Sequence, residues 1–175
     1  TEGPLTPTYS WSVNGNNVGN TSTYIVDASE TNVGDSIVCT ASVLNSNGNS
    51  ESITSSLVVD NTLPTVSQVS ISPSSGVYND SEITCLGTAT DPDSSVSLIY
   101  SWLVSGIPVG NGDTLDLATT SAMPYDAVTC YATAIDTSNG TNSLSASINV
   151  GDRAPSAPLI TITPVDPVPG LDDII

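Results

Sequence analysis

The stretch YSWLVSGIPVGNGD at residues 100–113 has a near copy in the same chain, YSWSVNGNNVGNTS at residues 9–22. Trp102 follows Trp11 by 91 residues, and the Gly-Asn pair at residues 110–111 follows the one at residues 19–20 by the same spacing. A fixed internal period of this length indicates small domains arranged in series. We therefore expect each period to correspond to one domain.

The same spacing continues in both directions from these two stretches. Cys130 follows Cys39 by 91 residues, and PSAPLITITP from residue 155 echoes PTVSQVSISP from residue 64. Short linkers containing proline separate the copies and favour semi-rigid joints. We predict three units with these bounds: a domain lacking its first strands at residues 1–61, a complete domain at residues 62–152, and the first strands of a third domain at residues 153–175.

The charge balance excludes one class of partner. The 175 residues contain 18 acidic side chains, no lysine or histidine, and Arg153 as the single base, for a formal net charge of −17. Such a chain cannot neutralise phosphates, so we expect no nucleic-acid partner. No stretch approaches the roughly 20 apolar residues of a membrane helix, so we expect no membrane span in this segment.

Apolar residues alternate with polar ones along short segments. VTCYATA places Val128, Cys130, Ala132 and Ala134 on one face of a strand, and YSWLV and LSASINV follow the same pattern. Turn-forming clusters such as SPSSG, GNGD and TSNGT separate these segments. The pattern predicts an all-β fold of antiparallel β-sandwiches that repeats every 91 residues.

The order of three residues in the complete unit resembles a known signature. Cys85, then Trp102, then Cys130 is similar to the Cys…Trp…Cys order of immunoglobulin-like domains. The resemblance implies a disulfide between Cys85 and Cys130 that joins the two sheets, with Trp102 packed on it in the core. The sequence departs from the family at the tyrosine-corner position, which holds Val128 in one copy and Ile37 in the other.

The resemblance extends to the incomplete copy. It implies that Trp11 is a core residue and that Cys39 pairs with a cysteine outside this chain. The units resemble the repeated Ig-like, PKD-like or cadherin-like modules of large microbial surface proteins. Because disulfides persist in oxidising surroundings, we expect an extracellular or cell-surface location. The alternative is a pair of buried free thiols in a cytosolic sandwich.

Residue types needed for common catalytic mechanisms are missing. Without histidine or lysine the chain cannot form a Ser-His-Asp triad, a Cys-His pair, a Schiff-base lysine or a histidine-ligated zinc site. Paired acids remain, but they fall in turn segments at the ends of strands. We therefore expect no enzymatic activity.

Four acidic residues are expected at the entry end of the complete unit. In an Ig-like sandwich the loops after the two cysteine strands lie beside the incoming linker, which would gather Asp60, Asp91, Asp93 and Asp136. Ca²⁺ takes six to eight oxygen ligands, and carboxylates can supply them. We favour a solvated acidic surface that maintains solubility. The alternative is a calcium site at the domain junction, with calcium as a cofactor.

The uniform period and the plain Ser/Thr/Asn/Gly turns favour a structural role. We expect a non-enzymatic repeat of an extracellular stalk, filament or adhesin shaft, with neighbouring repeats and other copies as its partners. The alternative is an Ig-like module that binds a glycan or a protein through its loops. The incomplete first unit could be completed by a covalent upstream segment, which we favour, or by strands donated from another copy.

Overall fold

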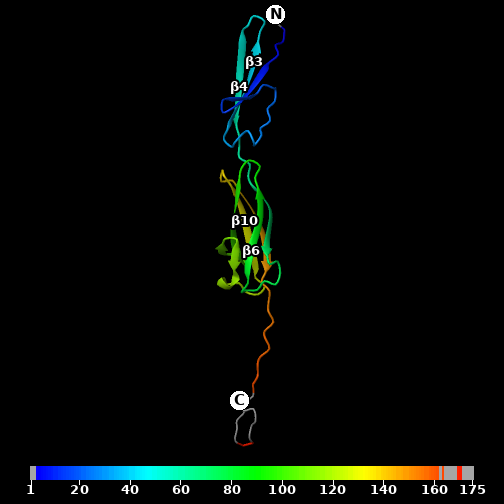
Figure 1. The fold of residues 1–175 in the computed structure, drawn as a ribbon, viewed down its shortest axis with the longest axis vertical. Helices are drawn as coiled ribbons and strands as arrows, with labels where there is room; N and C mark the ends of the chain where they lie inside the picture. The colour runs from blue at the N-terminus through cyan, green and yellow to red at the C-terminus, as the bar shows by residue number, and fades with distance from the viewer. Residues whose placement is uncertain (1–2, 162, 164–168, 171–175) are drawn as a thin grey trace.

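The computed structural model describes residues 3–161, 163, 169 and 170. Two β-rich bodies lie end to end along the long axis, and an extended segment leaves the second body toward the C-terminus (Figure 1). Within the described residues the chain forms eleven strands and one short 3₁₀ helix. Among them there is no helix long and apolar enough to cross a membrane.

The first body is a single antiparallel sheet in the order β2-β1-β3-β4. Its strands are β1 (Thr8–Val13), β2 (Asn16–Gly19), β3 (Ser36–Leu44) and β4 (Ser50–Val58). Strands β1 and β3 align so that Trp11 lies opposite Cys39. The equivalent pair in the second body is Trp102 opposite Cys130, so one register serves both bodies.

The second body consists of two antiparallel sheets, β5-β6-β9 and β11-β10-β7-β8. Its elements are β5 (Thr65–Ser72), β6 (Glu82–Thr90), β7 (Val96–Val104), β8 (Ile107–Asn111), β9 (Thr114–Asp116), η1 (Leu117–Thr119), β10 (Ala127–Asp136) and β11 (Thr141–Asn149). The cysteine strand of each sheet is central, and the tryptophan strand lies next to β10. This is an Ig-like β-sandwich, so the predicted fold class is confirmed.

The core forms where the inward faces of the two sheets meet. Along β10 the inward residues from Val128 to Ala134 are fully buried, because successive side chains of a strand point to opposite faces. A disulfide joins Cys85 on β6 to Cys130 on β10, as the resemblance implied. Trp102 has no exposed surface and belongs to the same core cluster as the disulfide.

The same tryptophan hydrogen bond occurs in each body, at positions one sequence period apart. Trp11 Nε1 donates to the carbonyl oxygen of Thr21 at 2.9 Å, and Trp102 Nε1 donates to that of Gly112 at 2.9 Å. Both acceptors lie ten residues after their tryptophan. The two sequence copies therefore fold alike at the level of single contacts.

A carboxylate also occurs at the same position in both copies and makes the same hydrogen bond. Asp35 accepts from the Asn32 N–H at 2.8 Å, and Asp126 accepts from the Met123 N–H at 2.9 Å. In each case these hydrogen bonds stabilise the charged form and hold the pKa of the carboxyl below its ordinary value. Both acids fix the loop that leads into the strand of the second cysteine position.

The first body differs from the second in its burial. Trp11, expected as a core residue, is only partly buried and stacks on Tyr24 with ring centroids 5.8 Å apart. Leu57, whose counterpart Ile148 packs on the core, is 54% exposed. The reason is that among the described residues no second sheet covers β1, β3 and β4. Cys39 is a free thiol in this structure.

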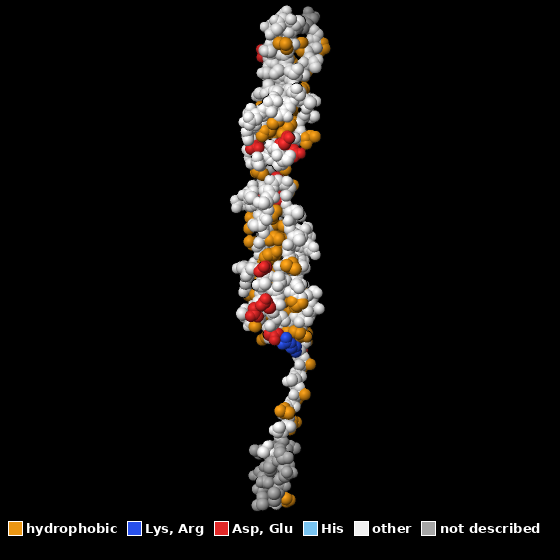
Figure 2. Space-filling model, in the orientation of Figure 1, with side chains coloured by type: hydrophobic (Ala, Val, Ile, Leu, Met, Phe, Trp, Pro, Cys, Tyr) orange, Lys and Arg blue, Asp and Glu red, His pale blue; other side chains and the backbone are white. Residues whose placement is uncertain are grey.

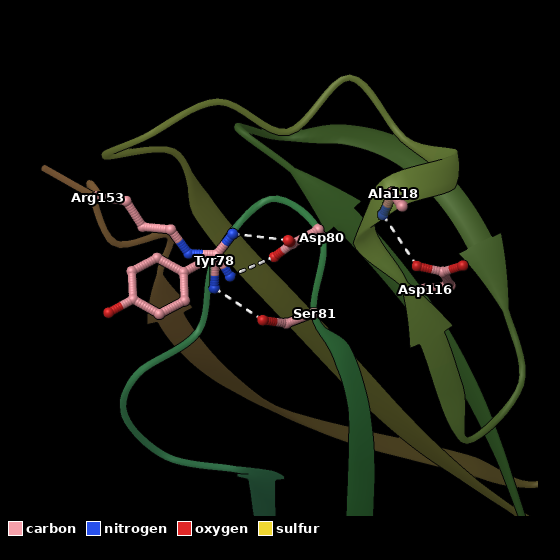
Figure 3. Close-up of polar contacts among 6 residues, drawn as sticks. All are labelled: Tyr78, Asp80, Ser81, Asp116, Ala118 and Arg153. Carbon is pink, nitrogen blue, oxygen red and sulfur yellow. Dashed lines mark hydrogen bonds and ion pairs between the residues drawn. The ribbon is translucent and has the colours of Figure 1, made fainter. Parts of the chain in front are cut away.

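The segment predicted to begin a third unit leaves the sandwich as extended chain. Residues 153–161 form no strand, because an isolated strand has no neighbour for its backbone groups. Residues 162, 164–168 and 171–175 of that predicted unit lie outside the described residues. Arg153 anchors the start of the segment: its guanidinium pairs with Asp80 at 2.6 Å and lies 4.1 Å from the centroid of the Tyr78 ring (Figure 3).

Candidate functional site

At the junction between the two bodies, the linker is hydrogen-bonded to two loops of the second body. The linker, residues 59–64, enters the second body where the β6–β7 loop (residues 91–95) and the β10–β11 turn (residues 137–140) lie. Pro64 at the end of the linker is almost fully buried. The linker is therefore part of the folded unit and not a free tether.

Asp136 is buried because of its place on a core strand. It is the next inward position of β10 after Ala134, and it is 5% exposed. Its Oδ1 accepts from the N–H groups of Ser138 at 2.8 Å and Gly140 at 2.7 Å, which shapes the turn. Its Oδ2 accepts from Asn61 Nδ2 at 2.9 Å, which ties the turn to the linker.

Gly140 permits this close approach. A Cβ atom at Gly140 would overlap Asp136 Oδ2, and it would lie 2.8 Å from Leu63 Cδ2 and 2.9 Å from Asn61 Nδ2. These distances are shorter than any van der Waals contact. A larger residue at this position would force the ends of these three side chains to move.

Two more carboxylates come from the β6–β7 loop. Asp91 Oδ1 accepts from the N–H groups of Asp93 at 2.9 Å and Ser94 at 2.7 Å. Asp93 Oδ2 accepts from the N–H of Thr62 at 2.8 Å, a second tie to the linker. This hydrogen bond is the main reason that the pKa of Asp93 lies below its ordinary value, while the nearby charge of Asp136 acts in the opposite direction.

Three of these side chains, one in the linker and two in the loop, each have a second oxygen that accepts no hydrogen bond. Asn61 Oδ1, Asp91 Oδ2 and Asp93 Oδ1 are shielded from solvent and have no hydrogen-bond partner. Only four buried side-chain atoms in the described part of the chain share that condition, so three of them are gathered here. Buried polar atoms are nearly always paired, and leaving them unpaired is unfavourable. We call Asn61, Asp91, Asp93 and Asp136 the junction cluster.

The structure thus brings together three of the four acids that the sequence singled out. Asp60, the fourth, is exposed and lines a neighbouring pocket of about 230 Å³ together with Asp93 and apolar residues of the first body. Asn61 and Gly140 were not predicted as site residues. In the part of the chain that the structure describes, no three His, Cys, Asp or Glu side chains group tightly enough to hold a metal by themselves.

Known proteins offer only a weak structural likeness to this chain. No protein-family model and no curated protein matches the chain. Among solved structures, the chain is similar to fibronectin(III)-like modules of CbhA from Clostridium thermocellum, at 19% identity and a TM-score of 0.37. The match covers 82% of this chain and 77% of that one.

Proposed function

We propose that this chain is a structural repeat of an extracellular stalk, filament or adhesin shaft and has no enzymatic activity. Units of this kind resemble the Ig-like, PKD-like and cadherin-like modules of microbial surface proteins. The proposal treats each period as a rod segment whose partners are the repeats before and after it. Its mechanical element is the junction.

The observation that carries the proposal is the way the linker is held. Asn61 and Thr62 are each hydrogen-bonded to a carboxylate of the following unit, at 2.9 Å and 2.8 Å. A linker fixed at successive residues restricts the angle between units more than a free tether does. Figure 1 shows the result, with the two bodies in line along one axis.

The disulfide supports an extracellular location, and the composition supports the absence of catalysis. The disulfide between Cys85 and Cys130 is compatible with an oxidising compartment, where such bonds persist. On the face seen in Figure 2, acidic side chains lie in scattered groups. With no histidine or lysine in the sequence, the usual general bases and nucleophile activators are missing.

A binding module is the second candidate, and one surface favours it. A depression of about 540 Å³ on the second body is lined by Leu98, Ile99, Tyr100 and the turn at residues 111–113. An aromatic side chain beside apolar residues can hold a ring or an apolar side chain of a ligand. This surface would recur along a shaft only if later repeats kept the same residues.

Immunogold electron microscopy of the source cells separates the two candidates. Antibodies raised against the second body should decorate extended projections of intact cells at several points along their length. Decoration that requires permeabilised cells would contradict the extracellular shaft. Decoration only at the tip of each projection would favour the binding module.

A further inference from the structure

We propose that the peptide bond between Arg153 and Ala154 is a cleavage site for trypsin-like proteases, and that Asp80 and Tyr78 guard it by holding the arginine side chain. This inference goes beyond the shaft function, and its test does not depend on that function. Cleavage adds one water across the bond and leaves a carboxylate on Arg153 and an amine on Ala154. It separates the second body from the chain that follows it.

The sequence offers such a protease one bond. Trypsin-like proteases bind a basic side chain in a pocket that contains a carboxylate, and they cut the peptide bond that follows that residue. The 175 residues contain one arginine and no lysine. Thr62 occupies the equivalent repeat position, 91 residues earlier, and the first linker therefore contains no bond of this kind. The exit of the second body is the one place where this class of protease can divide the chain.

The backbone beyond the bond is accessible. Residues 153–161 are exposed and belong to no strand or helix, and Figure 1 shows them leaving the second body as extended chain. An extended segment with free backbone groups can pair with a partner as an added strand. Before the bond, the Gly151 N–H donates to the carbonyl oxygen of Val77 at 2.7 Å. The chain is therefore free on one side of the bond and tied to the body on the other.

Two groups of the β5–β6 loop, residues 73–81, hold the arginine side chain. Nη1 and Nη2 of Arg153 donate to the two carboxylate oxygens of Asp80 at 2.6 Å each, and Cζ lies 4.1 Å from the centroid of the Tyr78 ring (Figure 3). Parallel hydrogen bonds of this kind are how a carboxylate recognises a guanidinium. A protease pocket needs the same N–H groups, so Arg153 must leave Asp80 before it can enter the pocket.

The fold of the loop builds this guard. The Tyr78 N–H donates to Ser81 Oγ at 2.9 Å, and the Ser81 N–H donates to the Tyr78 carbonyl oxygen at 3.0 Å. These two hydrogen bonds close a turn over residues 78–81, so the ring and the carboxylate come from one short turn. Val77 directly before it is buried and accepts the Gly151 N–H, which brings the exit of the body alongside the turn.

The guard should slow cleavage without preventing it. The side chains of Arg153 and Asp80 are each 53% exposed, and ion pairs and cation–π contacts at exposed positions are weak. Together the two contacts should lower the fraction of chains with a free arginine side chain by about 5- to 50-fold. The bond is thus a slow site while the loop is in place and a fast one once the arginine is released.

Limited digestion of the whole chain with trypsin tests the site. Mass spectrometry should find two products, residues 1–153 and 154–175, whose masses sum to that of the chain plus one water. Cleavage should be at least about fivefold slower than that of a free peptide of residues 149–158, which contains the same bond without the guard. Equal rates for chain and peptide would overturn the guard. No product from the chain at about a hundred times the trypsin that consumes the peptide would overturn the cleavage site.

Substitutions separate the guard from general stability. Asp80→Asn keeps the shape of the side chain and removes its charge, so cleavage should become about 3- to 10-fold faster. Asp113→Asn removes an exposed acid that lines a depression elsewhere on the second body and should leave the rate unchanged. Melting curves should show both variants folded at the digestion temperature, and the comparison of chain with peptide holds whatever the variants do. An unchanged rate in Asp80→Asn, or an equal rise in Asp113→Asn, would contradict the guard.

Discussion

At the residue scale, the packing of the junction depends on the absence of a side chain at Gly140. Its missing side chain lets the β10–β11 turn lie against Asn61 and Leu63, and Asp136 then reaches the linker. The counterpart in the first body is Asn49, an exposed residue with a full side chain. The two copies differ here because the turn of the second body packs against the linker.

Gly140→Ala should therefore destabilise the second body at its entry end by about 1 to 3 kcal/mol, because the new methyl group overlaps Asp136 and Asn61. Denaturant unfolding followed through β10 amide resonances measures the loss. Gly110→Ala is the matched control in the same body, since a Cβ there meets only Leu115 Cδ1, at 3.4 Å. Equal stability of the two variants would show that the close approach is not required.

At the element scale, β10 organises the second body. It carries the second cysteine, it pairs with β7 and β11, and its inward face runs from Val128 through the core to Asp136. The disulfide connects this strand to β6 in the opposite sheet. One strand thus links the core, the covalent bridge and the junction cluster.

Replacing both Cys85 and Cys130 by alanine should lower the free energy of unfolding of the second body by about 4 kcal/mol, because the bridge closes a loop of 45 residues. Denaturant titration of the oxidised chain and the double variant gives this difference. Cys39→Ala, which alters the free thiol of the first body, should leave that transition in place. A loss under about 1 kcal/mol for the double variant would contradict the role given to the bridge.

Much of β10 and its neighbours could be predicted from the sequence. Alternation from Val128 to Ala134 gives the buried face directly, and the spacing of Trp102 and Cys130 repeats that of Trp11 and Cys39. Asp136 continues the same alternation, so its burial could also have been expected. The partial burial of Trp11 was not predicted, because it depends on a second sheet and not on the strand that carries the residue.

The parts of the site that were missed depend on contacts between segments far apart in sequence. Asn61 precedes Asp136 by 75 residues, and no local pattern indicates that the linker folds back onto that turn. Gly140 lies among ordinary turn residues, and the tight space beside it is created in part by Asn61 and Leu63, which are distant in sequence. Asp60 lies at the end of a strand, as the other three predicted acids do, but its side chain is exposed to solvent.

At the scale of the whole molecule, the proposed shaft function depends on how the two bodies are joined. They lie in line, with the linker bonded to the second body and a pocket between them lined by residues of both (Figure 1). A row of such joints would transmit tension along one axis. The shaft function requires that the joint behave as part of a solid body on the time scale of molecular tumbling.

Residual dipolar couplings of backbone amides in one weakly aligned sample test this requirement most directly. The couplings from β1–β4 and from β5–β11 should fit a single alignment tensor, because a common tensor means that both bodies tumble as one. Two tensors of different magnitude in the same sample would mean that the bodies move independently, and a jointed chain of that kind would contradict the rod.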